Sequence, residues 1–156
     1  MVLAAALRFL EARPRSAAEV RRRLTGAGYR EELVAGAIER LAELGILDDE
    51  AFARAWIESR DRARPRGERA LRSELFRKGI DRQLADDVLD ERATEQPDAD
   101  AAAARRVLER HANALAGVAD PRARRQRAYA LLARSGFDSE TAVEAIAATF
   151  PRDSEG

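Results

Sequence analysis

The chain has 156 residues, and its net charge is zero because 28 basic residues balance 28 acidic ones. Aromatic residues make up only 5% and the apolar fraction is mostly alanine and leucine, so the composition favours helices over sheets. The absence of cysteine excludes disulfides and cysteine-based metal sites, and no apolar run reaches the roughly 18–20 residues of a membrane span.

The beginning of the chain predicts three helices. Ser16-x-x-Glu19 is a capping box at the start of the second helix, which is expected to end just before Gly28. A glycine there can adopt the left-handed conformation, and Tyr29 can pack back on the last turn as in a Schellman motif. The third helix should carry one apolar stripe. Its members are Leu33, Val34, Ala37, Ile38 and Leu41.

The next helix is expected to begin at Asp48, with Leu47 and Phe52 spaced as a hydrophobic staple. Further along the chain, an alanine-rich helix is predicted from Asp98 to about residue 116. Asp120-Pro121 then places an N-cap before a proline at the first helical position, which marks another helix start.

One short pattern recurs three times, at offsets of 51 and 57 residues. It reads Leu24-x-x-x-Gly28-Tyr29, then Leu75-x-x-x-Gly79-Ile80, then Leu132-x-x-x-Gly136-Phe137. Such self-similarity is typical of repeat proteins. We therefore predict an all-α protein of three tandem three-helix repeats. The predicted repeats are residues 1–47, 48–96 and 97–150, followed by a tail at 151–156.

Charge is segregated along the chain although the total is zero. Three basic segments alternate with three acidic ones: 13–30, 60–80 and 122–134 each carry +5, 31–50 and 81–100 each carry −6, and 138–144 carries −3. If the repeats stack with a constant rotation, the basic segments line up along one side. Such a surface suits a partner made of DNA and protein. An ordinary solvated surface, in which neighbouring helices neutralise each other, explains the same pattern.

Residues for catalysis are scarce. His111 is the one histidine, so the sequence offers no histidine metal site and no Ser–His–Asp arrangement. The Gly26-Ala27-Gly28 segment is not followed by the Lys-Ser/Thr of a phosphate loop. Trp56 is interpreted as a core residue rather than a platform for base stacking. We therefore expect neither an enzyme nor a cofactor nor a bound metal.

The segment 45–80 reads GILDDEAFARAWIESRDRARPRGERALRSELFRKGI and resembles the signature of the RecX family. The residues that carry the resemblance are Gly45, Leu47, Asp48, Asp49, Phe52, Ala53, Arg60, Gly67, Glu74, Leu75, Lys78, Gly79 and Ile80. Arg13-x-Arg15-Ser16-x-x-Glu19 is similar to the family's first repeat. The match is good over about residues 4–94, and over 98–150 only the repeat skeleton supports it.

The resemblance implies a small cytoplasmic bacterial regulator, folded as an elongated, curved rod of three-helix repeats. Such a protein binds the filament that the RecA recombinase forms on DNA, and it inhibits strand exchange, ATP hydrolysis and coprotease activity. It thereby acts in DNA repair, DNA recombination and the SOS response, either capping filament ends or lying in the filament groove. The family has no catalytic residues. We further expect a monomer without a membrane partner.

Basic residues are the predicted contacts to the filament or to single- or double-stranded DNA. They are Arg13, Arg15, Arg21, Arg22, Arg64, Arg66, Arg69 and Arg72. Two other functions remain open from the sequence. One is a direct DNA-binding protein of helix-turn-helix-like units, although no middle helix carries the Asn/Gln-plus-Arg set that reads bases. The other is a helical scaffold for a different protein.

Overall fold

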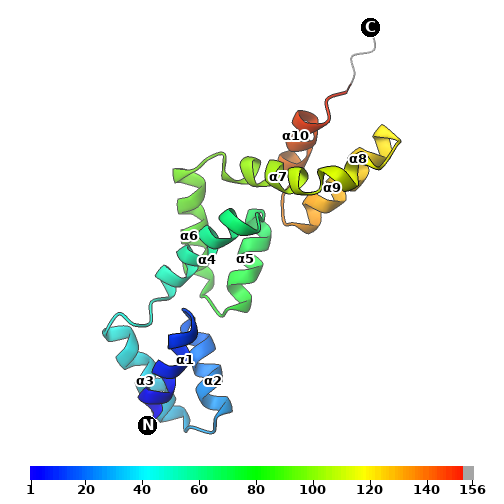
Figure 1. The fold of residues 1–156 in the computed structure, drawn as a ribbon. Coiled ribbons are helices and arrows are strands. Elements are labelled where there is room, and N and C mark those ends of the chain that lie inside the picture. The colour runs from blue at the N-terminus through cyan, green and yellow to red at the C-terminus, as the bar shows by residue number, and fades with distance from the viewer. Residues whose placement is uncertain (153–156) are drawn as a thin grey trace. The chain divides into compact units, whose positions relative to one another are not determined.

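The computed structural model describes residues 1–152, which form ten α-helices and no strand (Figure 1). The helices are α1 Val2–Ala12, α2 Ala17–Gly26, α3 Glu31–Glu43, α4 Asp49–Ala63, α5 Glu68–Arg77, α6 Arg82–Glu95, α7 Ala99–Arg110, α8 Ala112–Ala116, α9 Pro121–Arg134 and α10 Ser139–Thr149. The predicted all-α class is confirmed. Of the predicted tail, Pro151 and Arg152 follow the last helix, and 153–156 lie outside the described residues.

The helix starts expected from the sequence are present. Ser16 Oγ accepts from the backbone N–H of Glu19 at 3.2 Å, and Glu19 Oε1 accepts from the backbone N–H of Ser16 at 3.2 Å, which completes the capping box of α2. Asp120 Oδ1 accepts from the backbone N–H of Arg122 at 3.1 Å, with Pro121 in the first turn of α9. These caps satisfy backbone donors that have no partner inside the helix.

The three repeated glycines end their helices in Schellman motifs. Gly28, Gly79 and Gly136 have φ of 93°, 77° and 90°, a conformation that glycine adopts without a steric penalty. In each motif the backbone N–H after the glycine donates to the carbonyl of the repeated leucine. The pairs are Tyr29 with Leu24 (3.3 Å), Ile80 with Leu75 (3.0 Å) and Phe137 with Leu132 (3.1 Å).

The predicted helix from Asp98 to about residue 116 is wrong in one respect, because it is divided at His111 into α7 and α8. The backbone N–H of His111 is shared between the carbonyls of Val107 (3.3 Å) and Leu108 (3.2 Å). Nδ1 of the same residue lies 3.0 Å from the Val107 carbonyl oxygen. A side chain that competes for the preceding turn in this way interrupts the regular ladder.

The described chain divides into two compact units. The first comprises Met1–Trp56 with Glu74–Val88, and the second comprises Ile57–Ser73 with the chain from Leu89 onward. Helices α4, α5 and α6 each contribute residues to both units. The boundaries of the three repeats remain a prediction.

Each unit has an apolar core. In the first unit, α1, α2 and α3 share a cluster of buried residues: Ala6, Val20, Leu24, Val34, Leu41 and Leu47. In the second unit, α7, α8, α9 and α10 share another: Ala103, Ala104, Val107, Leu108, Leu115, Ala128, Leu132, Phe137, Ala142, Ala145 and Ile146. Of the apolar stripe predicted for the third helix, Val34, Ala37 and Leu41 are buried, whereas Leu33 is 52% exposed.

Within residues 1–152, no helix combines the length and apolarity that crossing a membrane requires.

Candidate partner-binding surfaces

The start of α2 is held by residues far away in the sequence. Asp49 Oδ1, at the start of α4, accepts from the backbone N–H of Ala17 at 2.9 Å. Ser16 Oγ donates to the Lys78 carbonyl at 2.5 Å, at the end of α5. A Cβ added to Gly79 would collide with Cβ of Ala18. Two segments that follow α2 by some 30 and 60 residues are therefore fixed to its first turn.

The same junction recurs 51 residues later, in the second unit. Asp100 Oδ2 accepts from the backbone N–H of Glu68 at 3.0 Å, as Asp49 does from Ala17. The backbone N–H of Gly67, which takes the place of Ser16, donates to the Ser135 carbonyl at 2.9 Å. The recurrence shows that consecutive repeats are joined by one kind of contact, made by the first turn of a middle helix.

Several signature residues therefore have a structural role. Asp49, Gly67, Lys78 and Gly79 all contribute to the two junctions. Asp48 caps α4, because its Oδ1 accepts from the backbone N–H of Ala51 at 3.0 Å. These positions build the scaffold on which the basic residues are presented.

The aromatic residues of α4 are fixed from several sides. Phe52 is buried, and its ring centroid lies 6.2 Å from that of Trp56 in a stacked arrangement. Trp56 is half-buried, and its indole N–H donates to Glu74 Oε2 at 3.0 Å. Lys78 Nζ lies 4.9 Å from the indole ring. The sequence predicts Trp56 as a core residue, and the structure places its indole only partly in the core. Because of its contacts with Glu74 and Lys78, the indole is not a free platform for bases either.

Two of the predicted arginines belong to a cluster around one carboxylate. Arg13, Arg15 and Lys78 place nitrogens 3.7, 3.8 and 3.7 Å from Glu19 Oε2; we call these four residues the Glu19 cluster. The Glu19 side chain is only 12% exposed, so a largely buried carboxylate holds the three cations together. The Arg15 guanidinium also lies 4.1 Å from the centre of the Phe9 ring. Three cations face one anion here, which leaves the cluster positive.

The sequence did not reveal Lys78 as part of this cluster. It follows Glu19 by 59 positions, and only the junction between α2 and the end of α5 brings the two together. The signal was present in the signature, where Lys78 stands directly before a junction glycine. The contact between Lys78 and Glu19 can be recognised only when the packing of the repeats in three dimensions is known.

The other predicted arginines differ in exposure. Arg21, Arg22, Arg64 and Arg69 are exposed, whereas Arg66, Arg72 and the signature residue Arg60 are half-buried. Arg21 forms an ion pair with Glu31 at 2.6 Å, and Arg72 forms one with Glu68 at 3.0 Å. The first four of the eight predicted arginines lie in the first unit and the other four in the second.

Asp138, the N-cap of α10, contributes to the electrostatics near Arg69. The pKa of its carboxyl is below the ordinary value because the carboxylate accepts hydrogen bonds from Thr141, including the backbone N–H at 2.8 Å. The positive charge of Arg69 lowers this pKa further. Arg69 thus lies within electrostatic reach of an acid of the following repeat.

Arg92 is a buried cation that sequence reasoning missed. Its side chain is 8% exposed and donates to Asp61 at 3.0 and 3.1 Å and to Asp100 at 2.6 Å. Burial lowers the pKa of the guanidinium, but the hydrogen bonds and charges of both carboxylates outweigh it and raise the pKa. Since Asp100 also caps α5, Arg92 ties α4, α5, α6 and α7 together.

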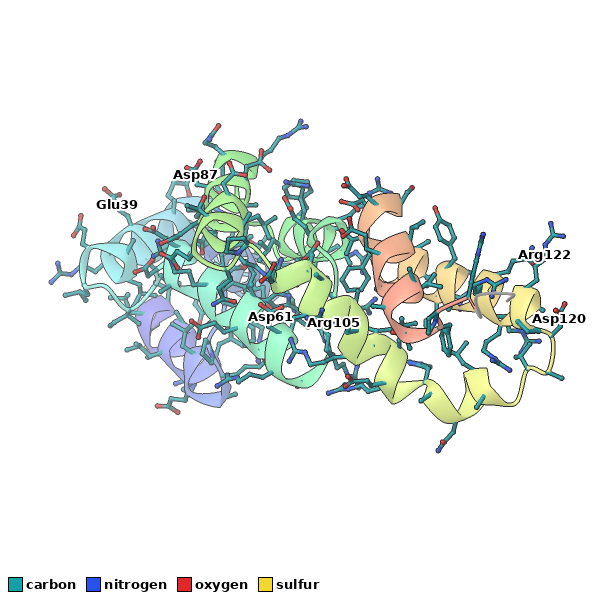
Figure 2. The ribbon with its side chains drawn as sticks, turned by 90° about the horizontal axis from the view of Figure 1, so that it is seen from above. Glu39, Asp61, Asp87, Arg105, Asp120 and Arg122 are labelled. Carbon is teal, nitrogen blue, oxygen red and sulfur yellow. The ribbon has the colours of Figure 1, made fainter. Side chains whose placement is uncertain are left out.

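The arginines of α9 point in several directions. Arg124 donates to the carbonyls of Leu115 (3.2 Å) and Val118 (2.8 and 3.1 Å), so it stabilises the link between α8 and α9. Arg122 and Arg125 line a groove against α10, while Arg127 lines a different one against α8. Asp120 and Arg122 mark the exposed start of α9 (Figure 2). The predicted basic segment 122–134 is thus not a single basic face.

These features define a class: a helical repeat protein with basic residues at and beside its repeat junctions. Among residues 1–152, no group of three or more His, Cys, Asp or Glu side chains is arranged to hold a metal ion. Comparison with known families gives a more specific result. A model described as "RecX, first three-helix domain" matches residues 3–41, and "RecX, second three-helix domain" matches residues 48–89.

Individual relatives agree. The Regulatory protein RecX of Chlorobium phaeobacteroides (strain BS1) is 34% identical over 141 residues, which are 90% of this chain and 88% of that protein. The protein of the same name from Mycobacterium sp. (strain JLS) is 47% identical over 78 residues. That alignment spans 50% of this chain and 43% of the relative. The chain belongs to the RecX family.

Two solved structures show the same fold. The crystal structure of RecX from Lactobacillus salivarius has a TM-score of 0.75 at 21% identity, covering 93% of this chain and 92% of that one. A crystal structure titled regulatory protein RecX has a TM-score of 0.77 at 22% identity, covering 90% of this chain and 67% of that one. The likeness includes the third repeat, which neither matched family model covers.

Proposed function

We propose that this protein is a non-catalytic cytoplasmic regulator that binds the RecA filament on DNA. In this proposal it inhibits strand exchange, ATP hydrolysis and coprotease activity, and so acts in DNA repair, DNA recombination and the SOS response. The observation that carries the proposal is family membership along 90% of the chain, with relatives named as regulatory proteins. We infer the RecA filament as the partner from the resemblance of the segment 45–80 to the signature of the RecX family.

The basic residues support this proposal. A filament of recombinase on DNA presents both phosphates and carboxylates, and guanidinium groups bind both through paired hydrogen bonds. The Glu19 cluster holds cations in fixed positions on the first unit. Exposed Arg22 lies in α2, and exposed Arg64 directly follows the last residue of α4. These residues are proposed to contact the filament.

The test is binding to filaments assembled on fluorescent single-stranded DNA by the cognate recombinase with a slowly hydrolysed ATP analogue. The variant R22E/R64E reverses two exposed charges that make none of the junction contacts described above. We expect its affinity to fall by about tenfold or more relative to wild type. R105E reverses another exposed arginine, in α7, and should bind like wild type.

Equal binding by R22E/R64E and wild type would show that Arg22 and Arg64 do not contribute to filament binding. Binding to naked DNA as tight as binding to the filament would instead favour the direct DNA-binding alternative. Binding is measured at two salt concentrations, because contacts to DNA phosphates give a steep salt dependence and so distinguish direct DNA binding from binding to the filament.

A further inference from the structure

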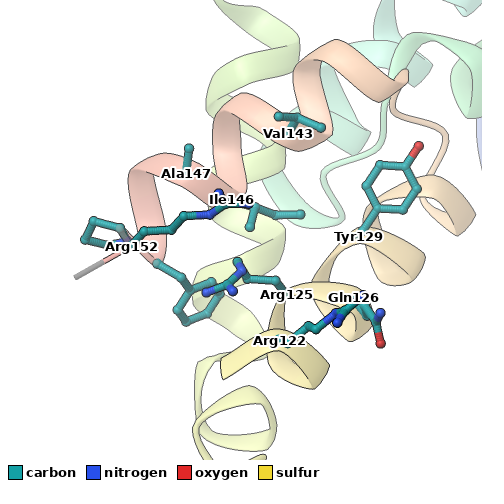
Figure 3. A pocket seen from close by; sticks show the side chains of 10 residues that line it. Arg122, Arg125, Gln126, Tyr129, Val143, Ile146, Ala147 and Arg152 are labelled. Atoms are coloured by element: carbon teal, nitrogen blue, oxygen red, sulfur yellow. The ribbon is translucent and has the colours of Figure 1, made fainter. Parts of the chain in front are cut away.

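A groove between α9 and α10 is a surface feature that the proposed function does not use. Its volume is about 850 Å³, and Figure 3 shows the side chains that line it. Helix α9 contributes Arg122, Arg125, Gln126 and Tyr129; the other side is lined by Val143, Ile146 and Ala147 of α10 and by Phe150, which directly follows that helix. Both sets follow the spacing i, i+3, i+4, i+7, so each is one continuous stripe along its helix. Pro151 and Arg152 close one end.

The side of the groove formed by α10 is apolar and open. Val143 is 57% exposed, Ala147 is exposed, and Phe150 is half-buried. Tyr129 is 39% exposed and its hydroxyl donates to Ser139 Oγ at 3.2 Å, which fixes the ring at one end of the groove. Exposed apolar surface of this kind, framed by polar side chains, is characteristic of a protein-binding site.

The opposite end of the groove is cationic. Arg122, Arg125 and Arg152 lie at the end where α9 begins and α10 stops, away from Tyr129 and Val143 (Figure 3). Of the ten described residues that line the groove, none is acidic. Arg124, the neighbouring arginine, is instead committed to the carbonyls of Leu115 and Val118. The groove therefore offers an unbalanced positive charge beside an apolar stripe.

We infer that this groove binds an acidic amphipathic helix of a partner protein. The apolar side chains of such a helix cover Val143, Ile146 and Ala147, and its carboxylates meet Arg122, Arg125 and Arg152. Two parallel helical stripes with an apolar side are the geometry used by helix-in-groove recognition. Nucleic acid is the less suitable occupant, because a phosphate backbone would leave the apolar side uncovered. The inference does not depend on the partner of the proposed function.

The probe is a fluorescein-labelled helical peptide of about 14 residues, about 21 Å long. It carries leucine at i, i+3, i+4 and i+7 and glutamate on both flanks, and a control peptide has lysine for glutamate. Anisotropy with the full chain should show saturable binding of the acidic peptide only. R122E/R125E and, separately, V143E should each weaken that binding by about tenfold or more. R105E is the matched control and should leave it unchanged.

Three outcomes would overturn the inference. The first is no binding of the acidic peptide to folded wild-type protein at concentrations up to about 1 mM. The second is binding that R122E/R125E and V143E leave intact, which would place the peptide elsewhere. The third is sedimentation of the free protein as a dimer that V143E dissociates, which would assign the groove to a second copy of this chain. All variants alter exposed or half-buried side chains, and circular dichroism checks that they fold.

Discussion

Arg92 and Glu19 illustrate how single residues determine this structure. Each is a largely buried charge surrounded by opposite charges: Arg92 by Asp61 and Asp100, and Glu19 by three cations. The desolvation of such groups is compensated only while the partners are present. Both residues join segments that are distant in sequence, so they affect tertiary structure rather than one helix.

Arg92→Met removes the charge and keeps most of the side-chain volume. Asp61 and Asp100 are 21% and 23% exposed, and would lose their shared cation. We expect the free energy of unfolding to fall by about 3 kcal/mol, measured by urea denaturation. Arg105→Met, at an exposed position, should change it by less than about 0.5 kcal/mol. A loss for Arg92→Met as small as that of the control would show that the ion pairs add no stability.

At the scale of helices, the sequence predicted what is local. The caps that Ser16, Asp120 and the three repeated glycines form act within one turn of their own helices, so residue type and spacing suffice to predict these caps. The division at His111 could not be predicted, because helix propensity of the surrounding alanines gives no signal for it. Leu33 belongs to the predicted apolar stripe but is exposed, because hydrophobicity alone does not show which face of a helix is covered.

The junctions between repeats could not be predicted from the sequence either. Asp49 and Asp100 each look like a residue of an acidic helix start, and only the fold shows that each accepts from another helix. The same limit applies to the candidate site. Arg13 and Arg15 could be selected from the sequence as basic residues, whereas Lys78 is recognised as a member of the Glu19 cluster only from its long-range contact with Glu19. Long-range pairs depend on how helices pack, which residue spacing does not encode.

Gly67→Ala tests the second junction. A Cβ at Gly67 would meet the Gly136 carbonyl and lie 2.6 Å from the Phe137 nitrogen, and backbone atoms cannot rotate away. We expect a loss of about 1–3 kcal/mol in the free energy of unfolding. Gly36→Ala is the matched control in α3, where an added Cβ meets nothing within 4 Å. It should stabilise by about 0.5–1 kcal/mol. Equal effects in both variants would contradict the described packing at Gly67.

For the molecule as a whole, net charge is a poor guide to partners. The total is zero, yet the Glu19 cluster and the end of the α9–α10 groove are both positive, and α3 begins with Glu31 and Glu32. The chain belongs to a family whose members are named regulatory proteins, and in the proposed function these surfaces recognise an anionic partner. Four of the signature residues, Asp49, Gly67, Lys78 and Gly79, hold repeats together, so this part of the motif reports on the fold rather than on a binding site.

The measurement that tests the central claim is the ATPase rate of the cognate RecA on single-stranded DNA, titrated with this protein at fixed salt. We predict inhibition by wild type and by R105E, and much weaker inhibition by R22E/R64E. Inhibition well below one protein per recombinase monomer would indicate capping of filament ends, and inhibition only near equal amounts would indicate binding along the groove. An unchanged ATPase rate in the presence of excess folded protein would contradict the account.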